Sequence, residues 1–272
     1  MTKTIINKQI LLLAVILFST VYESNGTEEI RRVIAGGGAT WHNIRDEGIS
    51  PSLFSGRHNS FFTGITKSKE SYVSHLDISF YNGQLHPGHY PELTDATMKT
   101  SMVNFNYAYM RRVKTSGGEN ISLSAGGSIN NSYFYHRHLL FDNSSVNSSF
   151  YTKISLAATG SYPFTWEEKD LVFNFRLSVP VLSVNIRPSY SMSKPIGFLT
   201  YPDNTFKAVL NSMDIATVDR FIGLNSRFWL DYRLSSRYGL KFSYEWDFFT
   251  FNGDNTVKSG SNTFMIHTFL DF

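Results

Sequence analysis

The sequence predicts a single all-β domain, an up-and-down antiparallel β-barrel that spans a membrane, made after removal of an export signal. Three observations predict it. An apolar N-terminal run is too short to cross a bilayer, most later segments alternate apolar and polar residues with period two, and the connections alternate between short and long. The resulting boundaries are 1–26 for the signal peptide and 27–272 for the barrel.

The N-terminus has the three parts of a secretory signal. Lys3 and Lys8 supply positive charge, an apolar run covers 10–18, and a polar stretch ends at Gly26, after which we expect cleavage. A spanning helix needs roughly 20 apolar residues. The alternative of a membrane anchor is therefore disfavoured.

Composition limits the possible functions. The 272 residues include no cysteine, which excludes disulfides, thiol catalysis and thiolate metal sites. Aromatic residues make up 15% of the chain, a bias that suits strands and membrane interfaces. The net charge of +3 comes without the clustered Lys/Arg face that phosphate recognition needs, so no nucleic-acid partner is expected.

Period-two alternation is clearest in the segment 240–248. Leu, Phe, Tyr and Trp side chains occupy one face there, and Lys241, Ser243, Glu245 and Asp247 occupy the other. A soluble β-sandwich also alternates. The polar faces here carry charges in mid-strand, however, and the apolar faces are rich in Tyr and Phe, as a lipid-facing band would be. Only closed barrels let strands span a membrane, because lipid cannot satisfy an open edge.

Connection lengths predict about ten strands. Barrels of bacterial outer membranes have short periplasmic turns, long outer loops and an even strand number. If Phe272 ends at the periplasmic rim, an upward strand must precede the first clear one, and 29–40 is the only candidate. The nine clearer candidates are 53–67, 71–82, 101–113, 119–134, 148–163, 170–187, 215–234, 237–251 and 258–272.

Two segments fit this scheme less well. The segment 29–40 alternates poorly, so its strand is inferred from parity, and its Gly36-Gly37-Gly38 run is either a strand kink or a loop. That run lacks the Lys-Ser/Thr of a phosphate-binding loop. The longest connection, 188–214, holds a predicted short helix at 206–210.

The signal, the alternating aromatic strands and the terminal Phe-Leu-Asp-Phe272 resemble bacterial outer-membrane β-barrel proteins. The segments 76–80 and 237–247 are similar to small uncharacterised barrels of Bacteroidota. The resemblance implies location in the bacterial cell outer membrane and contact with its lipids. It also implies insertion by the barrel-assembly machinery through the C-terminal strand ending at Phe272. It implies no activity.

His58 and Ser60 form the one candidate catalytic pair. They are two residues apart, so both point to one face of a strand. Outer-membrane phospholipases and lipid A deacylases carry a similar His-x-Ser, in which Ser is the nucleophile and His the base. Activation requires a Ser–His hydrogen bond, and a third residue that orients the His is not identifiable here. The favoured alternative is two polar residues near the outer rim, and the chain is not expected to be an enzyme.

Six histidines are expected in or near the outer loops. Two pairs, His86-x-x-His89 and His136-x-His138, have ligand-like spacing, but a metal site would require several loops to converge. Solvated loop histidines are the favoured interpretation, and neither a metal nor another cofactor is predicted. The six are His42, His58, His86, His89, His136 and His138.

Charged residues on the inward faces predict a lumen charge network. Opposite charges across a narrow barrel would neutralise one another and fill its interior. Omptin-type barrel proteases place acidic and His residues near the outer rim. Here His75 and Asp77 lie at a depth that the sequence leaves open, and His267 and Asp271 lie near the periplasmic end. The predicted network is Asp77, Lys153, Arg176, Arg227, Asp231, Lys241, Glu245 and Asp247.

The favoured function is therefore that of an outer-membrane barrel with a largely occluded, charged lumen. Its role would be envelope-structural, or a surface interaction through the outer loops. Two alternatives stay open: a lipid-directed hydrolase that uses Ser60 and His58, and a narrow pore for small solutes.

Overall fold

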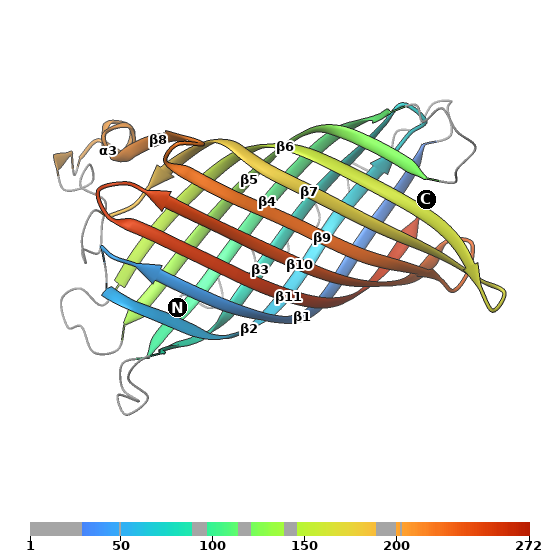
Figure 1. Ribbon diagram of the computed structural model, residues 1–272, viewed down its shortest axis with the longest axis horizontal. Helices are drawn as coiled ribbons and strands as arrows, with labels where there is room; N and C mark the ends of the chain where they lie inside the picture. Colours follow the sequence, from blue (N-terminus) through green and yellow to red (C-terminus); the bar gives the residue numbers. More distant parts are fainter. Residues whose placement is uncertain are drawn as a thin grey trace.

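A computed structural model describes residues 29–48, 50–88, 97–113, 121–138, 146–188, 200–201 and 203–272. The expected signal peptide, 1–26, lies outside these ranges. The described chain forms a closed barrel of long tilted strands with the short helix α3 at one end (Figure 1). In this part of the chain, no helix combines the length and apolar character needed to cross a membrane.

The strands follow one another around the barrel wall. Their bounds are β1 (Ile30–Asp46), β2 (Ser50–Ser68), β3 (Tyr72–Pro87), β4 (Met98–Val113), β5 (Ser122–His138), β6 (Val146–Trp166), β7 (Lys169–Ile186), β8 (Met213–Thr217), β9 (Phe221–Arg233), β10 (Tyr238–Asn252) and β11 (Thr256–Asp271). Successive strands pair antiparallel from β1 to β7, β7 pairs with β8 and β9, and the order closes through β10, β11 and β1.

The barrel wall has ten positions. The strands β8 and β9 both run antiparallel to β7, against Leu182–Ile186 and Leu171–Ser178 respectively, so they lie in line as one interrupted strand. This confirms the prediction of ten strands and an up-and-down antiparallel barrel. The predicted short helix is also present, as α3 (Thr205–Ser212). Its first turn is capped by the Asn204 side chain, which accepts a hydrogen bond from the Lys207 backbone N–H.

The strand inferred only from parity closes the barrel. The β1 strand pairs with β11 from Arg32↔Asp271 to Asp46↔Val257, and with β2 on its other side. The glycine run lies inside β1 and not in a loop. A Cβ added at Gly38 would collide with the carbonyl oxygen of Phe264 on β11. Glycine allows this close backbone approach, and it leaves the strand without the alternating side chains of its neighbours.

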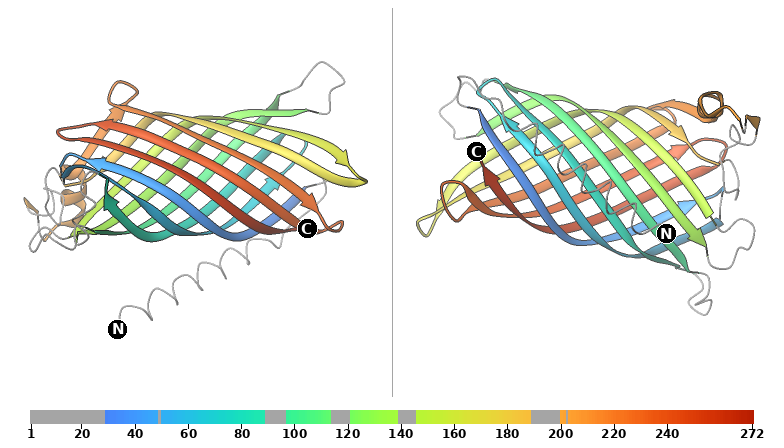
Figure 2. Two further views of the ribbon diagram at one scale, coloured as in Figure 1. Left: turned by 60° about the horizontal axis from the view of Figure 1, so that its bottom comes forward. Right: turned by 180° about the vertical axis from the view of Figure 1, so that it is seen from behind.

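The two ends of the barrel differ. At one end of the barrel, the start and the end of the barrel domain meet. Phe272 donates its backbone N–H to the Arg31 carbonyl oxygen there, at 2.8 Å. Short turns join β2 to β3, β6 to β7 and β9 to β10 at this end, and the β6–β7 hairpin projects beyond it (Figures 1 and 2). The longest connection, which contains α3, lies at the opposite end. We call these the periplasmic and outer ends.

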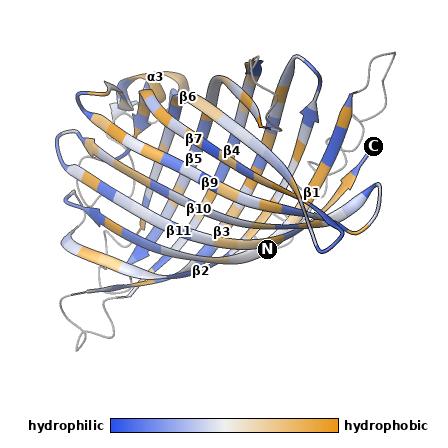
Figure 3. Ribbon diagram, turned by 45° about the vertical axis from the view of Figure 1, so that its right-hand side comes forward, coloured by the Kyte–Doolittle hydropathy of each residue, from blue (hydrophilic) through white to orange (hydrophobic). Residues whose placement is uncertain are grey.

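Apolar side chains cover the outside of the barrel. Orange, hydrophobic segments alternate with blue ones along the strands (Figure 3). Along the clear strands, exposed aromatic and aliphatic side chains face outward, while many of their sequence neighbours point inward and are polar. A membrane-spanning barrel has this inside-out pattern. Representative outward residues are Phe61, Phe80, Val103, Phe105, Tyr107, Ile129, Leu156, Phe173, Leu177, Ile222, Phe242, Phe264 and Ile266.

Several strands continue further toward the outer end than their sequences predict. The β1 strand reaches Asp46 instead of residue 40, β3 reaches Pro87 instead of 82, and β5 reaches His138 instead of 134. The added residues are paired with their neighbours along the ladder. Polar and histidine-rich segments that resemble loops in sequence are therefore strands, because their inward side chains are buried inside the barrel.

Candidate functional site: the barrel lumen

The inward side chains of the wall strand β10 show how the lumen changes from one end of the barrel to the other. From the periplasmic to the outer end, β10 points Lys241, Ser243, Glu245, Asp247, Phe249 and Phe251 inward. The chemistry changes along this row from charged to aromatic. Along β10, the lumen is therefore charged toward the periplasmic end and apolar at the outer mouth.

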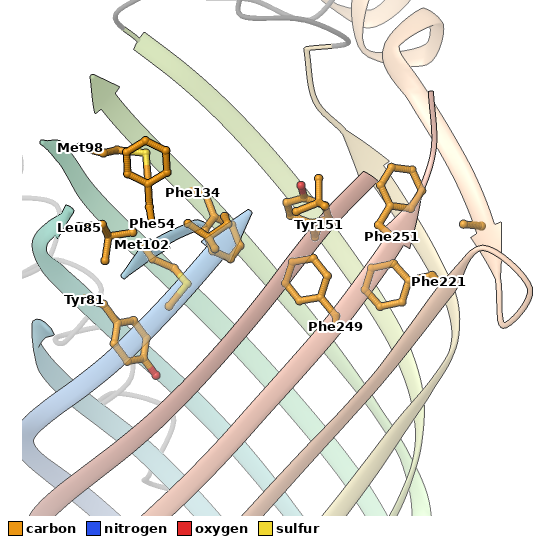
Figure 4. Close-up of a cluster of buried hydrophobic side chains, with 13 residues drawn as sticks. Phe54, Tyr81, Leu85, Met98, Met102, Phe134, Tyr151, Phe221, Phe249 and Phe251 are labelled. Carbon is orange, nitrogen blue, oxygen red and sulfur yellow. The ribbon is translucent and has the colours of Figure 1, made fainter. Parts of the chain in front are cut away.

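An apolar cluster, which we call the outer plug, fills the outer mouth (Figure 4). Its rings pack on one another: Phe221 and Phe249 stack with centroids 5.4 Å apart, and Tyr151 lies 5.3 Å from Phe249. A buried ion pair, Arg187 to Asp46 at 2.5 Å, lies beside it. The outer plug comprises Ile44, Phe54, Tyr81, Leu85, Met98, Met102, Phe134, Tyr151, Ala216, Phe221, Phe249, Phe251 and Val257.

Histidines line the lumen around the outer plug, and the expectation that His42, His136 and His138 belong to loops is wrong. His42 on β1, His58 on β2 and His136 on β5 are strand residues with buried side chains. The rings of His42 and His58 are 5.3 Å apart, and His42 Nε2 lies 3.0 Å from the Ser259 hydroxyl. His138 is buried on β5, His86 is the residue before the last of β3, and His89 lies outside the described residues. Over the described ranges, no three His, Asp or Glu side chains are arranged to hold a metal ion.

The candidate pair His58 and Ser60 points into the lumen, on the lumen side of the β2 wall. The Ser60 hydroxyl lies 2.6 Å from that of Thr40, which in turn lies 2.8 Å from that of Thr263. Neither ring nitrogen of His58 has a hydrogen-bond partner among the described residues. The structure thus brings the two residues to one face but does not join them by the hydrogen bond that activation requires. Their catalytic role stays a hypothesis.

Ion pairs cross the middle of the lumen. Arg227 of β9 joins Asp77 of β3 at 3.1 Å and Glu245 of β10 at 2.6 Å, and Arg176 lies 3.6 Å from Asp77. Nearer the outer end, Lys153 faces Asp247 at 3.5 Å. The Asn225 amide donates to the carboxylates of Glu245 and Asp247. Each charge therefore has a partner, as the low polarity of an enclosed barrel requires.

Little space is left around these ion pairs. Two cavities among the ion pairs measure about 30 Å³ each. That is room for one or two water molecules and not for a solute path. The middle of the lumen is therefore filled by its own side chains.

The periplasmic end is hollow instead. A cavity of about 270 Å³, which we call the vestibule, opens between the inner walls of the strands there. Arg32 of β1 reaches Asp231 and Asp271, both at 2.6 Å. The inward position of Arg32 is not apparent from the sequence, because β1 shows almost no alternation. The feature that reveals its position is the strand register, which places Arg32 directly opposite Asp271 on β11. Lys241 is the one member of the predicted network that makes no salt bridge with a described residue, and its Nζ lies 4.9 Å from the Trp229 ring.

The structure also settles the depth of the remaining acidic and His residues. His75 lines the vestibule and contacts the Thr66 hydroxyl at 3.0 Å, and Asp77 belongs to the central ion pairs. His267 bonds to Ser243 at 2.8 Å, and Asp271 lies at the periplasmic end. None of these four lies at the outer rim, where an omptin-type site would be.

Three charged residues form ion pairs at the periplasmic rim, where β1 begins. The Glu29 carboxylate accepts hydrogen bonds from Lys69 at 2.9 Å and Arg31 at 2.7 Å. These bonds lower the pKa of Glu29 below its usual value and raise the pKa of Lys69. The pair ties the segment before β1 to the β2–β3 turn.

Comparisons with known proteins agree with this architecture. The outer-membrane protease OmpT from Escherichia coli superimposes with a TM-score of 0.53 at 10% identity, covering 93% of this chain and 100% of that one. The fold is that of a bacterial outer-membrane β-barrel. Identity this low shows the fold alone. Together with the apolar outer surface, this fold shows that the protein lies in the bacterial outer membrane.

Other matches are more distant. The translocator domain of the autotransporter NalP from Neisseria meningitidis has a TM-score of 0.42 at 11% identity, covering 99% of this chain and 98% of that one. Neisserial surface protein A has a TM-score of 0.40 at 10% identity, covering 92% and 100%. No family model and no curated protein matches the sequence. The similarity to barrels of Bacteroidota stays a prediction.

Proposed function

We propose that this outer-membrane barrel is a non-conducting envelope protein, and that it acts through its outer end and not through a pore. The observation that carries the proposal is the outer plug above the central ion pairs. Aromatic packing at the mouth and paired charges below it leave no room for a solute. A structural or surface-interaction role fits a lumen of this kind better than transport.

The helix α3 supports the surface role. Phe206 and Leu210 are four residues apart, so they share one face of the helix, and they are 73% and 52% exposed. Ile215 on the following strand β8 is 60% exposed and lies on the outer surface of the barrel. We infer that this apolar surface rests on outer-leaflet lipid. A Phe206→Trp variant should then show added fluorescence that brominated lipids quench, whereas the added fluorescence of an Asp203→Trp control should be quenched less. Equal quenching in the two variants would rule this out.

The C-terminal strand supports assembly by the barrel-assembly machinery. Its residues pair with β1 to close the barrel, and the ring of Phe272 is 57% exposed at the periplasmic end. A Phe272→Ala variant should reach the outer membrane in smaller amounts, measured as heat-modifiable protein on gels. Phe264→Ala, which removes a similarly exposed ring from the middle of the same strand, is the control. Equal loss in both variants would contradict a specific terminal signal.

The non-conducting role is tested against both alternatives on the same purified protein. Folded wild-type protein should show no ion conductance in planar bilayers and no hydrolysis of ester-linked lipids. Steady conductance steps would favour the pore. Hydrolysis that is lost in a folded Ser60→Ala variant would favour the hydrolase. OmpT is a protease, but an identity of 10% shows the fold alone, and we do not propose protease activity.

A further inference from the structure

The vestibule has the chemistry of an anion-binding site. Among the described residues, four cationic side chains line it, Arg32, Arg112, Arg233 and Lys241, against one carboxylate, Asp231. A second carboxylate, Asp271, contacts Arg32 and Arg233 from the side, at 2.6 Å and 3.5 Å. Positive charges are still in excess. The hollow end of the barrel therefore carries a positive potential that faces the periplasm.

Lys241, like Arg112 at the exposed mouth, makes no salt bridge with a described residue. Asp231 lies on the neighbouring strand, directly opposite Lys241, but it is bound by Arg32 at 2.6 Å. The ammonium group of Lys241 is held instead above the Trp229 ring, at 4.9 Å. A cation–π contact compensates only part of the cost of placing an ammonium group inside a barrel. The unfilled space beside it offers room for an anion that would supply the rest.

The remaining wall suits an oxyanion. Hydroxyl groups surround the cavity, and the guanidinium of Arg112 at its rim donates to Ser68 at 2.8 Å and to Ser122 at 3.3 Å. Hydroxyls and guanidinium N–H groups are donors to phosphate and carboxylate oxygens. The hydroxyl-bearing lining residues are Thr66, Ser68, Ser122, Ser124, Thr159 and Ser161.

We propose that the vestibule binds a small oxyanion from the periplasm, of the phosphate or dicarboxylate class, with Lys241 as its main charge partner. A volume of about 270 Å³ admits such a molecule but not a polymer. The proposal is independent of the non-conducting role, because the outer plug stays closed above the site. A bound anion would complete the ion-pair pattern that the rest of the lumen already has.

Titration calorimetry of the folded, detergent-solubilised protein with inorganic phosphate, and separately with succinate, tests the proposal. At least one should bind saturably. Lys241→Met keeps the apolar stem above Trp229 and removes the charge, so affinity should fall about tenfold or more. Lys241→Arg should retain binding. Lys169→Met, at the exposed tip of the β6–β7 hairpin, removes a periplasmic charge outside the cavity and should leave affinity unchanged.

Absence of saturable binding to wild-type protein would overturn the proposal. Equal affinity in wild-type protein and a folded Lys241→Met variant would also overturn it. If Lys241→Met does not fold, Arg112→Gln at the exposed mouth replaces it, and unchanged affinity in that variant counts against the site. Binding of phosphate alone, or of succinate alone, identifies which oxyanion source the vestibule accepts.

Discussion

The outer and periplasmic ends of the lumen differ in how their inward side chains fill the space inside the barrel. At the outer end, aromatic and aliphatic side chains pack closely, and the cavity beside Phe54 and His138 measures about 10 Å³. At the periplasmic end, ion pairs and hydroxyls line an open vestibule. The difference teaches that a ten-stranded barrel whose lumen is closed at the mouth and in the middle can stay open at its periplasmic end. Closure by apolar packing at the mouth leaves the polar side chains below free to hold charge.

The largest effect is expected where packing closes the mouth. Phe249 is 2% exposed and touches three other rings, so Phe249→Ala should lower the free energy of unfolding by about 3–5 kcal/mol. Phe61→Ala removes the same ring from the outer surface, where it is 59% exposed, and should cost much less. Denaturant titration in detergent micelles measures both. Similar losses would mean that the outer plug is not a packed core.

The charged layers should respond according to whether a carboxylate is left unpaired. Arg227→Met strands Asp77 and Glu245 inside the barrel and should destabilise it by about 3–5 kcal/mol. Lys241→Met strands no carboxylate, because Asp231 keeps Arg32, and should cost roughly 1 kcal/mol or less. Unfolding curves of the two variants provide the comparison. An equal cost would show that Lys241 has a partner of its own.

The seam between β1 and β11 gives an intermediate effect. A methyl group at Gly38 would collide with the β11 backbone, so Gly38→Ala should cost about 1–3 kcal/mol. Gly260 lies on the other strand of the same seam, where an added Cβ meets nothing within 4 Å, so Gly260→Ala should be close to neutral. Heat-modifiable gel mobility at graded temperatures follows both. A Gly38→Ala variant as stable as the wild-type protein would show that close approach to the β11 backbone does not require glycine at this position.

The smallest effect is expected at the periplasmic rim and depends on pH. The folded-state pKa of Glu29 lies below its unfolded value, so its ion pairs stabilise the fold at pH values above the unfolded pKa. That contribution is lost as the pH falls through the folded-state pKa. Glu29→Gln should therefore cost less than about 1 kcal/mol at pH 7 and nothing once Glu29 is protonated. Unfolding of wild-type protein and Glu29→Gln is measured at pH 7 and pH 3. An equal difference in unfolding free energy between the two proteins at both pH values would contradict this prediction.

Sequence patterns predicted the strands because membrane strands must alternate, and Lys241 to Asp247 show that alternation plainly. They also predicted which charges point inward. They did not predict partners, since the contact of Arg227 with Asp77 joins residues 150 positions apart across the lumen. The histidine positions were wrong for another reason. A polar segment that is buried by barrel closure, such as 135–138, has the composition of a loop.

Thiol labelling tests the difference between the two ends most directly, because the chain contains no cysteine. Ser124 lies on the vestibule wall, and Ser259 lies near the outer plug, bonded to His42. In the folded, solubilised protein, a small charged thiol reagent should label Ser124→Cys rapidly and Ser259→Cys far more slowly. Labelling of both at similar rates would contradict a lumen that is open at the periplasmic end and sealed at the outer one.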